Sequence, residues 1–318
     1  MKAIRVSQFG DPSVLEYADL PALTPGSGQL LVRLHAAGVN PVEAYMRAGK
    51  YPQLPTLPYT PGFDGAGLIE HSDDPAFPPG TRVYVARSLT GTYAEQALCT
   101  PAQVHPLPAH ASFEQGAAIG TPYATAAWAL FNRGQARRGE TLLIHGASGG
   151  VGLAALQLAR AAGLRVFGTA GTPDGLDLIR QFGAEAAFNH RDPQYLDQLK
   201  AAAGGPGFDI ILEMLANQNL GHDLTLLAPR GRVIVVGSRG PVEIDPRNIM
   251  TREADIRGVT LFSATPAELA HIYASVTAGL ESRQLAPVIG ASFPLREAAR
   301  AHEQIMTSAA RGKIVLTM

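Results

Sequence analysis

The hydrophobic pattern of the chain changes near residue 122. Before that point, short runs of alternating or β-branched residues, such as KAIRVSQF, QLLVRLHAAGV and RVYVAR, are separated by clusters of proline and glycine. Short runs with turn residues between them are typical of irregular all-β structure with long loops. The pattern therefore predicts a mainly β domain over residues 1–121.

From about residue 122 to 264, apolar strands alternate with amphipathic helical segments. The six strand candidates are TLLIH, RVFGTA, AAFNH, FDIILEML, GRVIVVG and IRGVTLFS. Nearly continuous apolar strands are buried on both faces, as in a doubly wound parallel sheet. We therefore predict an α/β protein with a six-stranded Rossmann sheet in this stretch.

The pattern after residue 264 predicts a return to the first domain. TPAELAHIYASVTAGL and REAARAHEQIMTS have the apolar spacing of helices, and GKIVLTM has that of a strand. The predicted organisation is thus one domain from residues 1–121 and 265–318, with a second domain at 122–264 inserted in it.

Composition and charge exclude several classes of function. The formal net charge is −1, with 46% hydrophobic and 17% charged residues, so neither nucleic acid nor an anionic membrane is an expected partner. We see no signal peptide and no apolar stretch long enough to span a membrane. The one cysteine, Cys99, excludes an internal disulfide and favours a cytoplasmic location.

A glycine-rich turn, HGASGGVGLAA, follows the first predicted strand of the second domain. Gly149 and Gly152 match the last two glycines of a GxGxxG turn, while Ala147 stands where the first would be. Such a turn lets a pyrophosphate approach backbone N–H groups at the start of a helix, and the Ser148 hydroxyl adds a donor. A plain strand–helix turn is the alternative, but the regular strand–helix series downstream favours a dinucleotide site.

The end of the second strand favours NADPH over NADH. NAD sites usually have Asp or Glu about 20 residues after the glycines, to bind the ribose 2′-hydroxyl. Here that strand ends in GTAGT, residues 168–172, without an acid. Asp174 lies two residues further on and would oppose a 2′-phosphate if it turned inward. Arg191, after the third strand, is either a phosphate partner or a solvated loop charge.

No motif in the chain supplies its own reactive group. HExxH and clusters of cysteine and histidine are both missing from the sequence. A zinc site is therefore not expected, and we expect no metal and no assigned general acid or base. The chemistry is expected to come from the bound cofactor, with the protein supplying position and excluding water.

Ten short motifs in one order resemble the medium-chain dehydrogenase/reductase superfamily, in its branch of zinc-free, zeta-crystallin-like NADPH:quinone oxidoreductases. They are GVNPVEAYMRAGKY, LPYTPGFDGAG, GTYAEQAL, QGAAIGTPYATA, HGASGGVGLAA, GTAGT, FNHRD, IILEMLAN, GRVIVVGSRG and GVTLFS. Zinc-dependent relatives have metal ligands where this chain reads Gly38-Val39-Asn40 and Gly62-Phe63-Asp64. The resemblance therefore implies a metal-free mechanism.

The resemblance also implies the architecture and the cofactor residues. The first domain would be a GroES-like catalytic domain, the second would bind NADPH, and the substrate would lie in a cleft between them. Asn40 and Tyr45 would lie near the nicotinamide. The remaining cofactor residues implied by the resemblance are Ser148, Gly149, Gly150, Val151, Gly171, His190, Asn219, Val236, Gly237, Ser238, Arg239, Leu261 and Phe262.

The first domain supplies the candidate substrate residues. Asn40 either lines the substrate cleft or only caps the turn before Pro41. Tyr45, Tyr51 and Tyr59 lie in one proline-rich loop, where they either pack the loop or contact a flat quinone. We interpret all four as candidates for the cleft.

The leading hypothesis is an NADPH-dependent quinone reductase, which transfers a hydride or single electrons from nicotinamide C4. One alternative is a zinc-free reductase of α,β-unsaturated ketones or aldehydes, which would need a proton donor. Another is an NADPH-binding structural or RNA-binding protein with little turnover. The last strand, IRGVTLFS, would be an open edge, so a homodimer or a homotetramer is expected.

Overall fold

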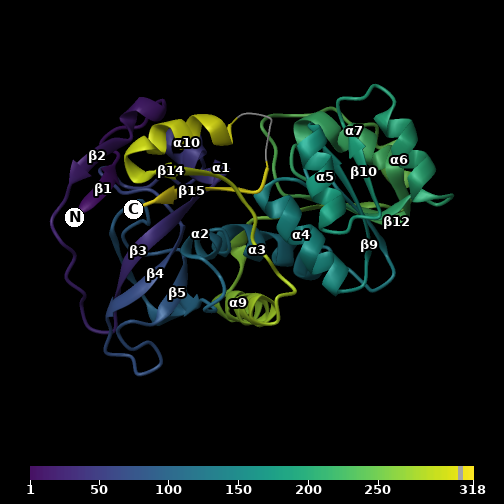
Figure 1. Ribbon diagram of the computed structural model, residues 1–318. Coiled ribbons are helices and arrows are strands. Elements are labelled where there is room, and N and C mark those ends of the chain that lie inside the picture. The colour runs from purple at the N-terminus through teal and green to yellow at the C-terminus, as the bar shows by residue number, and fades with distance from the viewer. Residues whose placement is uncertain (307–310) are drawn as a thin grey trace. The chain divides into compact units, whose positions relative to one another are not determined.

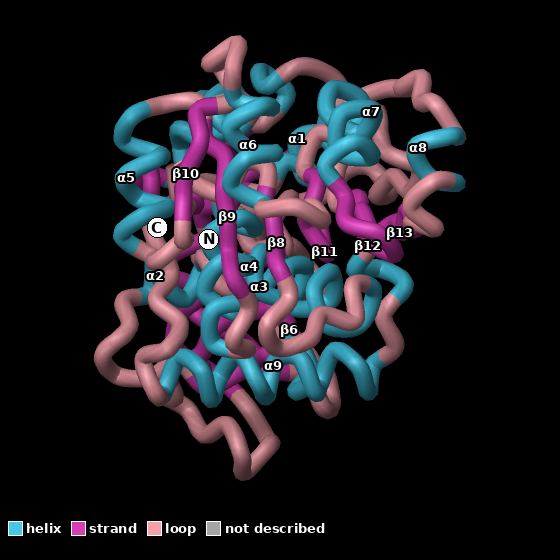
Figure 2. Tube along the Cα trace, turned by 90° about the vertical axis from the view of Figure 1, so that its right-hand side faces the viewer, coloured by secondary structure: helices cyan, strands magenta, loops and turns pink. Residues whose placement is uncertain are grey.

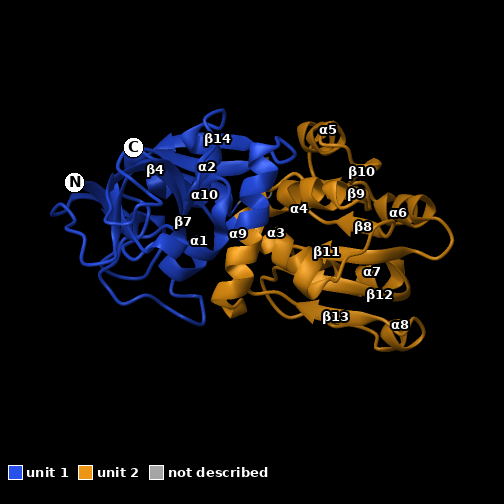
Figure 3. Ribbon diagram, turned by 90° about the horizontal axis from the view of Figure 1, so that it is seen from below, with its two compact units in different colours: residues 1–121, 273–308, 312–318 blue, residues 122–272, 309–311 orange. Residues whose placement is uncertain are grey.

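A computed structural model describes residues 1–306 and 311–318 (Figure 1). The chain divides into two compact units, coloured separately in Figure 3. Unit 1 contains residues 1–121, 273–308 and 312–318, and unit 2 contains residues 122–272 and 309–311. The predicted second boundary, at 265, lies just before helix α9 (Pro266–Glu281), and the observed boundary falls within this helix.

Unit 1 is built on a seven-stranded, mostly antiparallel sheet. Its strand order is β14-β15-β3-β4-β5-β7, and β6 pairs with β3 beside this path. The strands are β3 (Leu30–Val39), β4 (Asp64–His71), β5 (Arg82–Ala86), β6 (Gln96–Cys99), β7 (Val104–Pro106), β14 (Ile289–Pro294) and β15 (Lys313–Thr317). A separate hairpin joins β1 (Lys2–Arg5) to β2 (Glu16–Asp19). The predicted return of the C-terminal strand to the first domain is thus confirmed.

Among the described residues, three α-helices belong to unit 1 alone, and two of them, α1 and α2, were not predicted. They are α1 (Pro41–Arg47), α2 (Phe113–Ala117) and α10 (Ala298–Ile305). The prediction of a loop after β3 was wrong for α1, because Asn40 is a good N-cap and Pro41 is preorganised for the first helical position. The helix predicted over 296–308 is confirmed as α10, and its predicted last residues, 307 and 308, lie outside the described residues.

Unit 2 contains the predicted six-stranded parallel sheet, in the order β10-β9-β8-β11-β12-β13 (Figure 2). The strands are β8 (Thr141–Ile144), β9 (Arg165–Ala170), β10 (Ala186–Asn189), β11 (Phe208–Glu213), β12 (Leu227–Val235) and β13 (Asp255–Gly258). The crossover helices are α4 (Gly150–Ala161), α5 (Pro173–Gln181), α6 (Tyr195–Ala203), α7 (Ala216–Leu226) and α8 (Arg247–Met250). Right-handed crossovers place α4 and α5 on one face and α6 to α8 on the other.

Two details of unit 2 differ from the prediction. The last strand was expected to run through Ser263, but β13 ends at Gly258, and Leu261–Ser263 form a 3₁₀ turn. Helix α3 (Gly120–Ala127) and the π-helical segment Trp128–Arg133 were not predicted. Their apolar residues are buried nearly all round, so no polar face marked the segment as a helix.

The core of unit 2 lies between the sheet and helices α6 and α7. Phe208 is completely buried and contacts Phe167 edge to face, with the ring centroids 5.4 Å apart. Leu199 and Leu224 reach the same cluster from the two helices. Within residues 1–306 and 311–318, no helix is both long enough and apolar enough to cross a membrane.

Phe208→Ala is expected to lower the free energy of unfolding of unit 2 by about 3–5 kcal/mol, because it removes a buried ring and leaves a cavity. Trp128 is the one tryptophan of the chain and is buried in unit 2, so its fluorescence during urea unfolding reports on this unit. Met250→Ala, at a side chain that is 73% exposed, is the control and should change the value by less than about 0.5 kcal/mol. Equal effects of the two variants would contradict the assigned core.

Candidate functional site

The glycine turn of unit 2 connects β8 to α4 through a close approach of backbone to backbone. A Cβ atom on Gly152 would lie 2.5 Å from the Gly146 carbonyl oxygen and 2.6 Å from Ala147 Cα. Only glycine allows helix α4 to pack this closely against the end of its strand. Gly152 is therefore required by the packing of α4 against the turn, and the approach of a pyrophosphate to this turn stays a prediction.

The first turn of α4 is arranged to bind an anion. Gly149 is the N-cap residue and makes no side-chain capping bond, so the positive end of the helix is not neutralised by a side chain there. Gly150 and Val151 are the first two residues of the helix, and the buried Ser148 directly precedes the N-cap residue Gly149. These four residues fit the pyrophosphate of a dinucleotide.

Basic side chains surround the end of β9. A Cβ atom on Gly171 would lie 2.7 Å from His190 Nε2 and 3.0 Å from Arg191 Nε, so all three residues meet in one place. The Asp174 carboxylate is exposed and forms an ion pair with Arg311, with 3.3 Å between Oδ2 and the guanidinium nitrogen. It is therefore not an unpaired acid at the end of β9. Among the described residues, the strand end thus has no carboxylate to oppose a 2′-phosphate, and it has the Arg191 guanidinium beside it.

The second strand-end loop follows β12 on the same edge of the sheet. The N–H groups of Val236 and Gly237 donate to the Glu213 carbonyl oxygen at 2.8 and 3.3 Å. Arg239 N–H donates to Asn217 Oδ1 at 2.8 Å, and Ser238 Oγ donates to the Gly240 carbonyl. The loop is therefore held against the residues that follow β11.

The remaining predicted cofactor residues of unit 2 lie at the same carboxyl edge. The Asn219 amide donates to Glu213 Oε1 at 3.2 Å, which fixes the orientation of its side chain. Leu261 and Phe262 lie in the 3₁₀ turn after β13. All of the predicted cofactor residues from 148 to 262 thus follow the carboxyl ends of parallel strands, where ligands bind in such sheets.

Unit 1 contains a buried ion pair that the sequence analysis did not identify. Lys313 Nζ donates to Asp64 Oδ2 at 3.0 Å and also to Asn40 Oδ1. The Asn40 amide donates to Asp64 Oδ2 at 2.9 Å, and the backbone N–H of Thr121 donates to Asp64 Oδ1 at 2.7 Å. Asp64 is completely buried and Lys313 is 3% exposed, so each charge depends on the other.

The register of the sheet brings these residues together. Strand β15 pairs with β3 so that Ile314 faces Val39, which places Lys313 beside Asn40. Strand β3 pairs with β4 so that Gly38 faces Asp64. Three side chains from distant parts of the sequence therefore converge at one end of the central strand, where Asn40 also begins helix α1.

A chain of hydrogen bonds leads from Asn40 into the core of unit 1. Glu43 Oε2 accepts from the Asn40 N–H at 2.8 Å and from the Tyr93 hydroxyl at 2.7 Å. Because the phenolic proton is given to Glu43, His302 Nε2–H donates to the Tyr93 oxygen at 3.1 Å. Phe63 N–H donates to Glu43 Oε1 at 2.9 Å. Lys313 and Asp64 thus bind the Asn40 side chain, and Glu43 binds its backbone N–H.

Burial controls the ionisation of this chain. It raises the pKa of Glu43, against the opposing charge of Lys313, and it raises the pKa of Tyr93 well above its usual value. Burial lowers the pKa of His302 to about 3, so this imidazole is neutral at physiological pH. Lys313 is therefore the side chain that supplies positive charge to Asp64.

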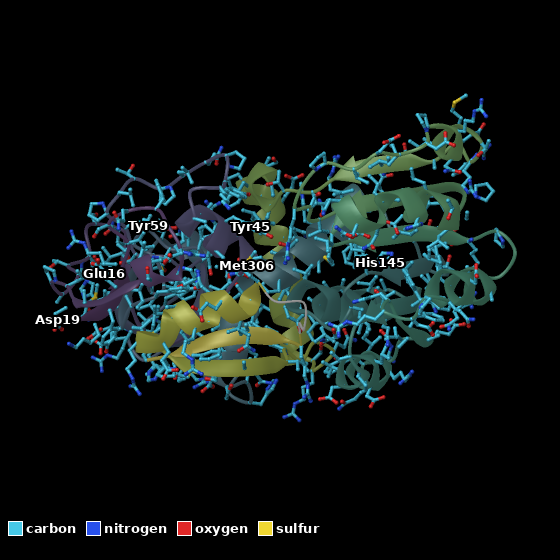
Figure 4. All side chains as sticks on the ribbon, turned by 90° about the horizontal axis from the view of Figure 1, so that it is seen from above. Glu16, Asp19, Tyr45, Tyr59, His145 and Met306 are labelled. Atoms are coloured by element: carbon cyan, nitrogen blue, oxygen red, sulfur yellow. The ribbon has the colours of Figure 1, made fainter. Side chains whose placement is uncertain are left out.

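The three candidate tyrosines lie in different environments. Tyr45 is on helix α1 and half-buried, and Tyr51 follows that helix (Figure 4 labels Tyr45 and Tyr59). Tyr59 forms an isolated β-bridge with Val6 and packs against a hydrophobic core cluster, and burial raises its pKa to about 12. The description of one shared loop was therefore wrong for Tyr45. Tyr59 has the surroundings of a packing residue.

Glu43, Tyr93, His302 and Lys313 were missed by sequence reasoning. Glu43, three residues after Asn40, matches a capping-box spacing that could have been noticed. Lys313 stands out as a charge beside the apolar run IVLTM, but only the register of β15 shows what it faces. Tyr93 and His302 carried no local signal.

Family models match both units of the chain. The model described as alcohol dehydrogenase GroES-like domain matches residues 26–109, and the one described as zinc-binding dehydrogenase matches residues 150–276. Together the two matches cover more than half of the sequence.

Individual relatives match over the whole length. The quinone oxidoreductase of Homo sapiens is 51% identical over 322 positions, covering 100% of this chain and 98% of the relative, and that of Rattus norvegicus is 50% identical with the same coverage. The quinone oxidoreductase of Thermus thermophilus, solved alone and with NADPH, is 32% identical, covers 100% of both chains and superposes with a TM-score of 0.88. The chain belongs to the medium-chain dehydrogenase/reductase superfamily, in the branch of the quinone oxidoreductases.

Proposed function

We propose that the protein is an NADPH-dependent quinone oxidoreductase that needs no catalytic metal. The observation that carries the proposal is the edge of the unit 2 sheet, where an uncapped helix N-terminus follows β8 and the end of β9 has Arg191 beside it and, among the described residues, no opposing carboxylate. Relatives of about 50% identity over the whole chain are named quinone oxidoreductase. The reaction converts a quinone, NADPH and a proton to a hydroquinone and NADP⁺.

Bound NADPH would supply the reducing equivalents from C4 of its nicotinamide. The residues of this chain would bind and orient it. Ser148 to Val151 would hold the pyrophosphate, and Gly171, His190 and Arg191 would hold the 2′-phosphate. Asn219 and the loop Val236–Arg239 would lie along the same edge. Because Gly171 has no side chain, the His190 and Arg191 side chains can approach the end of β9 closely.

The interior of unit 1 supports chemistry without a metal. Lys313 supplies the positive charge that Asp64 needs, and it binds the Asn40 side chain at the position where zinc-dependent relatives are expected to have a ligand. A quinone carbonyl is electrophilic enough to be reduced without a Lewis acid. We propose that Asn40 and Tyr45 orient the substrate and that water supplies the one proton that the reaction takes up.

We further propose that the protein is a cytoplasmic homodimer. Strand β13 is an edge strand that pairs only with β12 among the described strands, and two such edges can pair with each other. Cys99 is buried and unpaired, and burial raises its pKa to about 12, which suits a reducing compartment.

The proposed activity is tested by adding NADPH or NADH to the purified protein together with ortho-quinones, para-quinones or enones. We expect loss of the reduced-nicotinamide absorbance that depends on the quinone and is far faster with NADPH. Turnover of enones alone would show that the substrates are α,β-unsaturated carbonyl compounds and not quinones. Tight NADPH binding without oxidation by any acceptor would contradict the enzymatic function and favour the binding-protein alternative.

Arg191→Ala is expected to lower kcat/KM for NADPH by about 10- to 100-fold, since a charge-assisted contact to phosphate contributes roughly 1.5–3 kcal/mol. The value with NADH, which has no 2′-phosphate, should change little. Arg180→Ala is the matched control, because Arg180 lies on the exposed part of α5 and pairs with Asp177. An equal loss with both cofactors in the Arg191 variant would show that Arg191 does not read the 2′-phosphate.

A further inference from the structure

A second group of buried ionisable side chains lies in unit 2, beneath the proposed cofactor edge. His145 directly follows β8, Glu213 ends β11 and Asp223 lies on α7. Asp223 and Glu213 are completely buried and His145 is 3% exposed. Figure 4 labels His145 on unit 2. The proposed reaction does not use any of these three groups.

Contacts join the three side chains into one cluster. His145 Nε2 lies 2.9 Å from Asp223 Oδ1 and 3.8 Å from Glu213 Oε2. Thr169 Oγ1 lies 3.4 Å from the other ring nitrogen, His145 Nδ1. The imidazole is therefore next to two carboxyl groups that no solvent reaches.

Two oxygens of this cluster have no hydrogen-bond donor. Glu213 Oε2 and Asp223 Oδ2 are both buried without a partner among the described residues. Leaving two buried acceptors unsatisfied is costly, and a buried net negative charge is costlier still. One proton held between the two carboxyl groups would satisfy both oxygens and make the cluster neutral when His145 is charged.

We propose that Glu213 and Asp223 share one proton beside a charged His145, and that this neutral cluster is a positioning unit for the NADPH edge. Glu213 Oε1 accepts from Asn219 Nδ2 at 3.2 Å and from the backbone N–H of Leu215, so the carboxyl group holds the segment after β11. His145 itself begins the glycine turn. The inference rests on the proposed binding of NADPH to this edge.

The direction of the pKa shifts agrees with the shared proton. Burial raises the pKa of Glu213, the charge of His145 lowers it and Asp223 raises it again, to a net value of about 7. Burial lowers the pKa of His145, but Asp223 and Glu213 together raise it to about 9. The cluster is therefore neutral below about pH 7 and gains a negative charge between the two values.

Other titratable groups face the cluster from neighbouring elements. His190, after β10, has its pKa lowered by burial and by the positive charges of His145 and Arg191. Tyr195, on α6, has its pKa raised by burial and by the charges of Asp223 and Glu213. Neither pKa shift favours a positive charge, which is what would be needed to cancel the negative charge gained by Glu213.

A negative charge beneath the edge would repel an anionic cofactor. NADPH should therefore bind most tightly to the protonated cluster, and binding above about pH 7 should take up a proton. Between about pH 6 and pH 8, the Kd should rise by up to about tenfold from this cluster. The 2′-phosphate of NADPH titrates in the same range, so the informative quantity is the difference between the wild type and a variant that cannot titrate.

Glu213→Gln is that variant, since glutamine keeps the shape and can donate a hydrogen bond to Asp223 as the protonated carboxyl group would. Calorimetry of NADPH binding, in buffers of different ionisation enthalpy, should show the wild-type Kd at about pH 6 and about tenfold tighter binding than wild type at about pH 8. Glu185→Gln, at an exposed residue paired with Arg165, should behave as the wild type. Equal pH dependence in wild type and Glu213→Gln would overturn the proposal.

Infrared difference spectroscopy of the cofactor-free protein separates this proposal from that of the function. A band of a buried protonated carboxyl group should disappear as the pH rises through about 7, and it should be absent from Glu213→Gln but present in Glu185→Gln. Absence of this band from the wild type would overturn the shared proton. Stoichiometric divalent metal in the purified protein, lost in Glu213→Gln, would also overturn it. Failure of NADPH to bind while the band is present would instead contradict the proposed function.

Discussion

The ion pair between Asp64 and Lys313 is the interaction on which the interior of unit 1 depends. Both side chains are buried, so neither charge can be left without the other. Through the pair, the ends of β15, β3 and β4 are joined, and Asn40 is oriented at the start of α1. The positive partner of this pair is a side chain of the protein itself, not a bound metal ion. The polar interior of unit 1 is therefore organised by side chains of the protein alone.

For unit 2 we propose a different electrostatic role, which is to bind an anionic cofactor. The helix N-terminus after Gly149 and the Arg191 guanidinium near Gly171 supply positive potential where the strands end. Beneath this edge, His145, Glu213 and Asp223 place three ionisable groups in the core. Their protonation determines whether the interior opposes or tolerates the charge of the cofactor. The edge and the cluster are therefore parts of one electrostatic arrangement.

The sequence predicted the parallel sheet and its glycine turn because both depend on local patterns. Apolar runs, turn residues and the spacing of glycines are readable within a few positions, as at 141–152. Lys313, Tyr93 and His302 were missed because their roles depend on strand register and on contacts between residues more than 200 positions apart. Helix α1 was missed because only its cap, Asn40-Pro41, marks it. The role of Asp223 was missed because its partners, His145 and Glu213, lie at the ends of two other elements, β8 and β11.

A double-mutant cycle on Asp64→Asn and Lys313→Met is the most direct test of the role of the buried pair. Each single variant leaves one buried polar partner without its counterpart and should lower the free energy of unfolding of unit 1 by roughly 3–5 kcal/mol, measured by urea and far-ultraviolet circular dichroism. The double variant should lose much less than the sum of the two, and the quinone-dependent oxidation of NADPH should fall in parallel with the loss of Asn40 orientation. Additive effects, within about 0.5 kcal/mol, would contradict the account, because they would show that the two side chains do not depend on each other.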